Sequence, residues 1–215
     1  MKINVFVKKI DYKSAISFLL PRHYSGRKPN IKFAYGLFED GLLTAVCTFG
    51  IPASRSLCVG VCGEKYSKNI IELNRLLSVS ENYVLSKFVS KCLKLIKKEG
   101  DFVVVSYADT DMNHNGYIYQ ATNFKYTGKT KERTDKYTEG NKHSRHYNNE
   151  MQNGLRRVRS AKHRYIYFCT NNKDIISSLK YKEEPYPKGE NKKYKLGDFL
   201  KPKIIIDAKS KKEGG

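Results

Sequence analysis

The feature that most limits how this chain can fold is the apolar run Phe102-Val103-Val104-Val105. The run is short, β-branched and without alternation, so it predicts a strand that is buried on both faces. The polar sequence Ser106-Tyr107-Ala108-Asp109 follows it directly. Because side chains at the carboxyl end of such a strand face the crevice where open α/β sheets bind ligands, we expect Asp109 to act at a functional site. The alternative is that Asp109 only caps the following turn.

A second strand and a helix precede this run and complete a βαβ unit. Ile70 to Leu77 predicts a strand, and Ser78 with Glu81 has the spacing of a capping box. The helix that follows, over Glu81 to Lys98, carries one apolar face and ends before Gly100. Because strands joined through a helix lie parallel, part of the sheet is expected to be parallel, with Phe102 to Tyr107 at its centre.

The N-terminal part of the chain predicts a strand, a helix and a hairpin. Met1 to Val7 alternates weakly and predicts a strand, and Asp11 to Leu20 predicts a helix. Lys32 to Phe38 and Leu42 to Phe49 flank an Asp-Gly pair, which is a strong hairpin signal. The stretch from Gly60 to Gly63 is expected to be irregular.

The charge of the chain indicates its partner. Lysine and arginine number 41 against 21 acidic residues, which gives a net charge of +20. A field of that size favours a polyanion, with nucleic acid first. No stretch approaches the ~18 apolar residues that span a membrane, so no membrane partner is expected. Lysines interrupt the N-terminus where a signal peptide would be apolar, so we expect a cytoplasmic protein whose five cysteines are reduced.

The segment from Lys129 to Ser160 is basic and almost free of aliphatic residues. It is either a disordered loop or a DNA-binding insertion whose tyrosines stack on bases. We expect the insertion to be poorly ordered without DNA and to carry much of the DNA affinity. Lys162-His163-Arg164 then opens a strand that continues over Tyr165 to Phe168. Residues 1–180 are expected to form one domain, and residues 181–215 a basic C-terminal extension.

Several blocks of sequence resemble known proteins. Tyr119 lies five residues before Phe124, a spacing that resembles the tyrosine of GNAT acetyltransferases, which protonates the leaving thiolate of coenzyme A. Further blocks resemble the Mom family of phage DNA-modification proteins, which have a GNAT-like fold. These blocks are His23-Tyr24-Ser25-Gly26-Arg27, Phe49-Gly50-Ile51-Pro52, Glu72-Leu73-Asn74-Arg75-Leu76, Ser106-Tyr107-Ala108-Asp109, Gly116-Tyr117-Ile118-Tyr119-Gln120-Ala121 and Lys162-His163-Arg164-Tyr165.

The resemblance implies a fold, an activity and partners. The fold is α/β (α+β): a GNAT-like twisted mixed sheet with helices on both faces, extended by the basic insertion and the basic tail. The activity is a transferase that converts the exocyclic amine of adenine in phage DNA to a carbamoylmethyl derivative, which protects the DNA from host restriction. The partners are double-stranded DNA with the adenine flipped out of the stack, a small-molecule group donor, and a second copy of the chain in a homodimer.

The same resemblance implies site residues. Asp109 would accept a proton from the adenine amine or orient it, and Tyr119 would be the acid toward the leaving group. The expected catalytic residues are His23, Tyr24, Asp109 and Tyr119, with His23 also a ligand of an iron ion. The expected cofactor residues, for acetyl-CoA or another acyl donor, are Arg75, Leu76, Ser78 and Ser80. On the basis of the positive charge rather than the resemblance, the expected DNA contacts are Arg27, His143, Arg145, His146, Lys162, His163 and Arg164.

Three alternatives remain open on the sequence. The turn from Leu77 to Asn82 holds no glycine, whereas acyl-CoA enzymes of this fold hold the pyrophosphate on a glycine-rich turn at a helix N-terminus. Attack on a thioester would also give an N-acetyl rather than a carbamoylmethyl group. The alternatives are a non-catalytic DNA-binding protein, an ordinary GNAT acetyltransferase acting on tRNA or protein, and a nuclease built on His143 and His146, which lacks a nearby carboxylate cluster.

Overall fold

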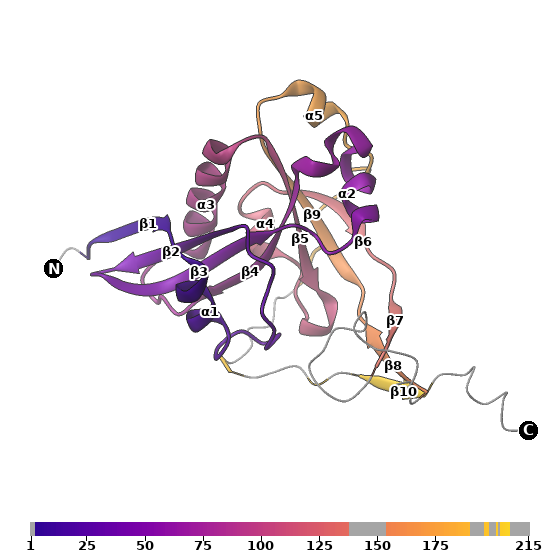
Figure 1. The fold of residues 1–215 in the computed structure, drawn as a ribbon, viewed down its shortest axis with the longest axis horizontal. Helices are drawn as coiled ribbons and strands as arrows, with labels where there is room; N and C mark the ends of the chain where they lie inside the picture. Colours follow the sequence, from indigo (N-terminus) through magenta and orange to yellow (C-terminus); the bar gives the residue numbers. More distant parts are fainter. Residues whose placement is uncertain (1–2, 138–153, 190–195, 198–200, 202, 207–215) are drawn as a thin grey trace, which may run out of the picture.

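The computed structural model describes residues 3–137, 154–189, 196–197, 201 and 203–206. Its main sheet has the strand order β1-β2-β3-β4-β5-β9-β6 (Figure 1). Only β4 and β5 run parallel in this sheet, so the predicted mixed sheet is confirmed, with β5 between β4 and β9. The strands are β1 (Val5–Lys9), β2 (Phe33–Glu39), β3 (Leu42–Gly50), β4 (Ile70–Ser78), β5 (Phe102–Asp109), β6 (Lys125–Lys129) and β9 (Lys162–Cys169).

Helices cover both faces of this sheet. Neighbouring residues of β5 point to opposite faces: Val104 packs in the cluster that includes Phe88 of α3, whereas Val103 packs in the cluster that includes Val61 of α2. The predicted helices on both faces are therefore confirmed. The helices are α1 (Tyr12–Leu19), α2 (Arg55–Cys62), α3 (Leu85–Glu99), α4 (Tyr117–Gln120) and α5 (Lys173–Ser177), with 3-10 turns η1 (Glu64–Asn69) and η2 (Thr110–Met112).

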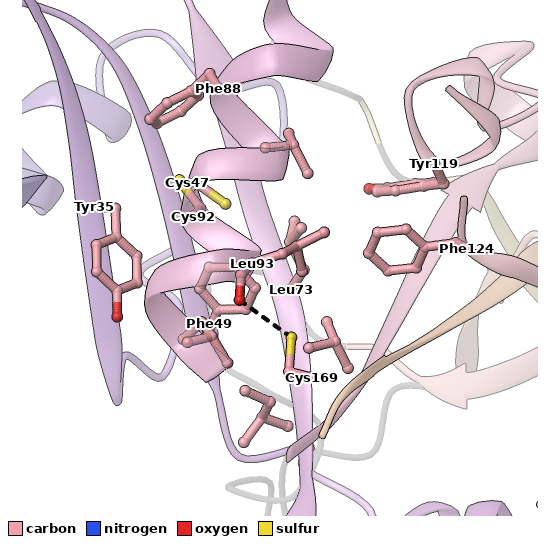
Figure 2. Packing of buried hydrophobic residues seen from close by; sticks show 14 of the residues in the cluster. Tyr35, Cys47, Phe49, Leu73, Phe88, Cys92, Leu93, Tyr119, Phe124 and Cys169 are labelled. Atoms are coloured by element: carbon pink, nitrogen blue, oxygen red, sulfur yellow. Dashed lines mark hydrogen bonds between the residues drawn. The ribbon is translucent and has the colours of Figure 1, made fainter. Parts of the chain in front are cut away.

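The core lies between α3 and the sheet. Figure 2 shows Phe88, Cys92 and Leu93 of α3 against Phe49 and Leu73, and these five side chains are almost fully buried. Burying a side chain of this size stabilises the fold by about 1.5–3 kcal/mol. Because the interior is close-packed, truncating Phe88 to alanine would cost about 3–5 kcal/mol. This packing fixes the position of β4 and β5, which carry the candidate site.

Local signals in the N-terminal part are reproduced closely. Asp11 caps α1 with its carboxylate, which accepts a hydrogen bond from the Ser14 amide at 2.8 Å. Asp40 and Gly41 both have positive φ, 47° and 84°, as a two-residue turn between β2 and β3 requires. The predicted helix and hairpin are therefore confirmed, with bounds that shift by a residue or two.

The predicted start of α3 is wrong. The helix begins at Leu85 rather than Glu81, and its N-cap Val84 makes no side-chain capping bond. Ser78 is the last residue of β4 and pairs with Ala45 of β3, while its hydroxyl accepts the Ser80 amide at 3.1 Å. Ser78 therefore belongs to the sheet, although the capping-box spacing predicted that it caps the helix.

The expectation of an irregular stretch from Gly60 to Gly63 is also wrong, because Gly60 lies inside α2. Ser54 caps this helix by accepting the Leu57 amide at 3.3 Å, and Gly63, with φ of 85°, ends it. A side chain at Gly60 would meet the hydroxyl of Tyr181 at 2.9 Å. The glycine therefore lets the C-terminal segment lie close against α2.

Part of the predicted disordered insertion is a second sheet, with the order β10-β8-β7. Its strands are β7 (Arg133–Lys136), β8 (Leu155–Arg159) and β10 (Ile204–Ile206). These strands have few aliphatic side chains and are joined by polar contacts between strands. Arg156 donates to the Thr134 hydroxyl at 2.7 Å, and Arg159 donates to the Asp135 carboxylate at 2.7 Å. The middle of the insertion, residues 138–153, lies outside the described residues.

The segment after α5 packs along the main domain. The Lys180 amide donates to the Val61 carbonyl at 2.9 Å, the Glu184 amide to the Tyr126 carbonyl at 2.9 Å, and the Tyr186 hydroxyl to the Phe124 carbonyl at 2.7 Å. These bonds tie residues 180–186 to α2 and β6. Among the described helices, none combines the length and the hydropathy that crossing a membrane requires.

Candidate active site

The site begins where β4 and β5 stop pairing. Their ladder covers only Ile70–Leu73 and Val103–Ser106, although both strands continue. We call the residues beyond the last pair, Asn74–Leu76 on β4 and Tyr107–Asp109 on β5, the β4–β5 junction. Carboxyl ends of parallel strands are the usual place for a ligand in such sheets. Beyond the last pair, the backbone groups of β4 and β5 that face each other make no ladder hydrogen bonds. They are therefore available to other partners.

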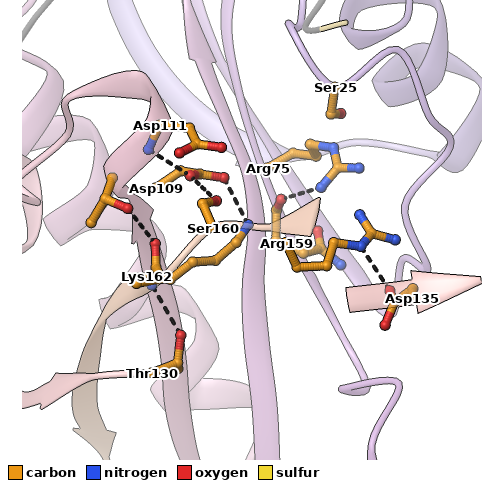
Figure 3. Close-up of polar contacts among 12 residues, drawn as sticks. Ser25, Arg75, Asp109, Asp111, Thr130, Asp135, Arg159, Ser160 and Lys162 are labelled. Atoms are coloured by element: carbon orange, nitrogen blue, oxygen red, sulfur yellow. Dashed lines mark hydrogen bonds and ion pairs between the residues drawn. The ribbon is translucent and has the colours of Figure 1, made fainter. Parts of the chain in front are cut away.

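Asp109 ends β5 and is held by three partners. Its carboxylate accepts hydrogen bonds from the Ser160 hydroxyl at 2.6 Å and the Asp111 amide at 3.1 Å, and it pairs with the Lys162 ammonium at 2.9 Å (Figure 3). Burial raises the pKa of Asp109, but Ser160 and Lys162 outweigh it and bring the pKa below its ordinary value. Asp109 therefore stays ionised, and it also caps η2, as the simpler interpretation held.

His23 and Tyr24 come from the loop after α1. Their rings stack with centroids 4.4 Å apart, and His23 is 6% exposed. Burial, followed by the charge of Arg75, lowers the pKa of His23 to about 3, so the ring is neutral at physiological pH. Its Nδ1 accepts the Ser25 amide at 3.2 Å, which places the ring proton on Nε2.

His114 was not singled out from the sequence. It follows η2, and its amide donates to the Asp109 carbonyl at 3.1 Å. Its ring meets the Tyr24 ring edge-on at 6.3 Å between centroids. No sequence motif marks a histidine five residues after Asp109. The turn between β5 and α4 brings His114 close to the loop of His23, which only the structure shows.

Arg75 lies at the centre of the junction. Its guanidinium donates to the Asn74 carbonyl at 2.6 Å and to the Arg27 carbonyl at 3.3 Å, while its Nε is buried with no partner among the described residues. Burial lowers the pKa of Arg75 and the neighbouring Tyr24 raises it, yet an arginine stays charged at any physiological pH. The junction therefore contains a fixed positive charge.

Further arginines gather beside Arg75. Burial lowers the pKa of Arg157 on β8, and the charges of Arg159 and Arg27 lower it further, so these three side chains are close together. Figure 3 shows Arg75 and Arg159 drawn with the Asp109 carboxylate, so the small sheet meets the main sheet at the junction. We call Arg27, Arg75, Arg157 and Arg159 the arginine group.

Tyr119 lies on α4, inside the core. It packs against Phe124 at 5.3 Å and Tyr165 at 5.2 Å between ring centroids, and Figure 2 shows its hydroxyl directed toward Leu73. Burial raises the pKa of Tyr119 well above its ordinary value, although a hydrogen bond with Ser106 opposes the shift. The phenol is therefore protonated at neutral pH, as a general acid must be.

Glu72, on β4, was not assigned a role from the sequence. It lies one residue before the end of the β4–β5 ladder, opposite Val105. Burial raises the pKa of Glu72, and the charges of Arg75 and Lys162 offset only part of that rise. A carboxylate between apolar residues of a strand is the signal that could have marked it.

The predicted DNA contacts fall into different environments. Lys162 pairs with Asp109, and Arg164 donates to Thr127 at 2.9 Å while its guanidinium lies 3.4 Å from the Tyr181 ring centroid. His163 is buried and shares a 2.9 Å hydrogen bond with the Tyr126 hydroxyl. Burial of His163 argues against a DNA contact there, while Arg27 joins the arginine group. The predicted contacts outside the described residues are His143, Arg145 and His146.

The predicted cofactor residues do not form a cradle for a pyrophosphate. The Ser78 hydroxyl accepts the Ser80 amide at 3.1 Å, and the Ser80 hydroxyl accepts the Tyr83 amide at 2.9 Å. The turn thus uses two of the amides that would hold a diphosphate, and the Leu76 side chain packs toward the core. The described residues therefore do not fit the usual acyl-CoA turn.

Iron is a second group that the resemblance implies. In the described part of the chain, no three histidine, cysteine, aspartate or glutamate side chains come together as a metal would need. His23 and His114 approach the same loop, but the Nδ1 of His23 is bonded to Ser25 and the Asp109 carboxylate is held by Lys162. The donors present do not fit an iron ion.

Comparison with known proteins gives a family and a fold likeness. A sequence profile described as the Mom protein family matches residues 4–188. No individually curated protein matches the chain significantly.

Several solved acetyltransferases are similar to this chain at low sequence identity. An N-acetyltransferase from Staphylococcus aureus Mu50 has a TM-score of 0.48 at 12% identity, covering 78% of this chain and 99% of that one. The IAA acetyltransferase from Bacillus cereus ATCC 14579 has a TM-score of 0.47 at 14% identity, covering 77% and 99%. Likenesses of this size say nothing about the chemistry of the site.

Proposed function

This chain belongs to the Mom protein family, and from that premise we propose that it is a transferase that modifies the exocyclic amine of adenine in DNA. The group added is a carbamoylmethyl group, and its consequence is protection of phage DNA from host restriction. The observation that carries the proposal is the β4–β5 junction, where Asp109, Arg75 and the loop of His23 meet. Three separated stretches of sequence supply one site, as a site built on a rigid sheet does.

The charge distribution supports a DNA substrate. The arginine group lies beside the junction, and the chain as a whole carries a net charge of +20. Arg159 is neutralised by Asp135, whereas Arg75 and Arg157 have no ion pair with a carboxylate among the described residues. Two uncompensated guanidiniums at the junction would hold backbone phosphates next to a flipped nucleotide.

The chemistry divides between binding and proton transfer. The amine nitrogen forms a bond to the methylene carbon of the donor, the leaving group departs with its bonding electron pair, and the nitrogen loses one proton. The donor therefore carries its leaving group on that methylene, because attack at a thioester carbonyl would leave an N-acetyl group. Tyr119 supplies the proton to the leaving group and is reprotonated from solvent, water takes the proton that the nitrogen loses, and ionised Asp109 orients Lys162 and the amine.

Mass spectrometry of nucleosides tests this proposal. Host cells would express the wild-type chain or Asp109→Asn, and their DNA would be digested to nucleosides. We expect carbamoylmethyladenine in the wild-type sample alone, together with resistance of that DNA to restriction enzymes that cut at adenine-containing sites. An N-acetyl product would instead indicate an ordinary acetyltransferase. Unmodified DNA bound tightly by the purified chain would indicate a non-catalytic binding protein.

A further inference from the structure

The turn between β5 and α4 carries site groups but has little regular structure of its own. It runs from Thr110 to Gly116 and begins with η2, after which the ring of His114 meets the ring of Tyr24. We call it the β5–α4 turn. Asn113 and Gly116 in this turn have positive φ, 54° and 76°. A non-glycine residue in that conformation is strained and persists where the surrounding structure fixes it. The turn therefore needs partners from other parts of the chain.

Gln120, the last residue of α4, supplies such partners. Its side-chain amide nitrogen donates to the Asn115 carbonyl at 3.0 Å, the Tyr165 hydroxyl at 3.2 Å and the Pro187 carbonyl at 3.2 Å. These acceptors belong to the β5–α4 turn, to β9 and to the segment after α5. The nitrogen has two hydrogens, so the three oxygens share them. One side chain thus joins three separate parts of the chain.

The Tyr165 hydroxyl extends this network. It donates to the Asn115 carbonyl, so that oxygen accepts from both Tyr165 and Gln120. Burial raises the pKa of Tyr165 to about 12, so the phenol keeps the proton that it donates. The Tyr165 ring also fills the space beside Gly116, where an added Cβ would collide with it. The turn is therefore held at two consecutive residues, Asn115 and Gly116.

The segment after α5 completes the network. Pro187 follows Tyr186, whose hydroxyl donates to the Phe124 carbonyl at 2.7 Å. A Cβ added at Gly189 would lie 2.7 Å from the side-chain nitrogen of Asn115. Residues 186–189 therefore lie against the β5–α4 turn, and the Gln120 amide binds both.

Tyr119 depends on the same network because α4 is short. The helix has four residues, and a helix of that length is not stable without tertiary contacts. Successive residues of a helix point about 100° apart, so Tyr119 and Gln120 leave the helix in different directions. Both nevertheless contact Tyr165, Tyr119 through its ring at 5.2 Å between centroids and Gln120 through its hydrogen bond. The bonds of Gln120 thus fix the direction of α4 as well as the turn.

We propose that Gln120 is a positioning residue of the adenine-modifying site. Through the Asn115 carbonyl it keeps His114 against Tyr24, and through α4 it keeps the Tyr119 hydroxyl directed at the leaving group. Gln120 acts through the main chain that carries these groups and touches no substrate. The expected effect on the reaction rate rests on the proposed function, whereas the effect on the turn is a property of the protein alone.

Two substitutions remove the donor and keep the length of the side chain. Gln120→Met has no polar hydrogen, and Gln120→Glu places an acceptor oxygen where the three acceptors need a donor. Tyr186→Phe is the matched control, because it removes one hydrogen bond of the same segment and leaves the Gln120 amide intact. Thermal unfolding would establish that each variant is folded, and should Gln120→Met fail to fold, Gln120→Glu decides.

The first measurement is the rate of carbamoylmethyladenine formation. Purified protein would be mixed with duplex DNA and a protein-free small-molecule extract of host cells as the donor source. We expect kcat to fall about 10²-fold in both Gln120 variants, since misplacing a reacting group by about 1 Å costs that much. KM for DNA should not change, because the arginine group is unaltered. Tyr186→Phe should keep the wild-type kcat.

The second measurement, the NMR signal of the His114 ring, reports the turn without any reaction. In protein that contains isotope-labelled histidine, this signal is the one absent from His114→Gln. We expect it to move in both Gln120 variants, because the Tyr24 ring no longer lies at the same distance, and to stay in Tyr186→Phe. A wild-type kcat or an unmoved signal in the Gln120 variants would overturn the inference and leave the proposed function intact. If the wild type forms no modified adenine, the proposed function fails, and the His114 signal still decides whether Gln120 holds the turn.

Discussion

The Asp109 carboxylate and the Lys162 ammonium lie 2.9 Å apart, at facing positions of the β5–β9 ladder. This pair ties the end of the central strand to the first residue of β9. Ser160, just before β9, donates to the same carboxylate at 2.6 Å. The three residues therefore hold the β4–β5 junction against the small sheet that carries Arg157 and Arg159.

Asp109→Asn should reduce stability in a pH-dependent manner. Loss of a buried carboxylate with charged and neutral donors costs about 1–3 kcal/mol in the free energy of unfolding. Because the pKa of Asp109 is depressed on folding, its contribution is fully present above the unfolded-state pKa and is lost as pH falls through the folded-state pKa. Urea unfolding at several pH values should show the two proteins converging toward acid. Asp111→Asn is the control, and a pH-independent difference would contradict this account.

Tyr119→Phe should leave the fold intact and slow adenine modification about 10²–10⁴-fold. The ring keeps its packing against Phe124 and Tyr165, while the proton for the leaving group is removed. Circular dichroism and the nucleoside assay measure the two effects. Tyr117→Phe, on the exposed side of α4, is the matched control. A Tyr119→Phe variant with wild-type rates would exclude the acid role.

Arg157→Gln should weaken DNA binding without regard to sequence. If Arg157 contacts one phosphate, the slope of log affinity against log salt should fall by about one unit. Fluorescence anisotropy on two unrelated duplexes across a salt series measures this slope. Lys13→Gln, on the exposed face of α1, removes the same charge away from the junction and should leave the slope unchanged. Equal slopes for wild type and Arg157→Gln would remove the arginine group from the interface.

Gly116→Ala should disturb α4 and with it Tyr119. Gly116 has φ of 76°, and an added Cβ would collide with the ring of Tyr165, so strain and overlap together should cost at least ~2 kcal/mol. Gly41→Ala separates the two causes, because Gly41 has φ of 84° but open space around its Cβ position. Thermal unfolding should show a clearly smaller loss for Gly41→Ala. Equal losses would mean that the contact with Tyr165 plays no part.

Elements that depend on neighbouring residues along the chain could be predicted before the structure was known. The β-branched run of β5 has no other way to bury its side chains, so its central position follows from composition alone. Asp40-Gly41 determined the β2–β3 hairpin because that turn needs two residues with positive φ. The position of Asp109 at the end of β5 followed directly from the strand.

Features that depend on partners distant in sequence could not be predicted, because those partners come together in the folded chain alone. Ser78 could cap a helix or end a strand, and pairing with Ala45 of β3 decided for the strand. The arginine-rich β8 pairs with β7, and hydrogen bonds between the two strands satisfy its arginine side chains. Composition alone predicted a disordered loop for this segment. Likewise, Asp109 and Glu72 are both carboxylates, and the sequence does not rank their basicity. Burial raises the pKa of Glu72, whereas the donors that converge on Asp109 outweigh burial and lower its pKa.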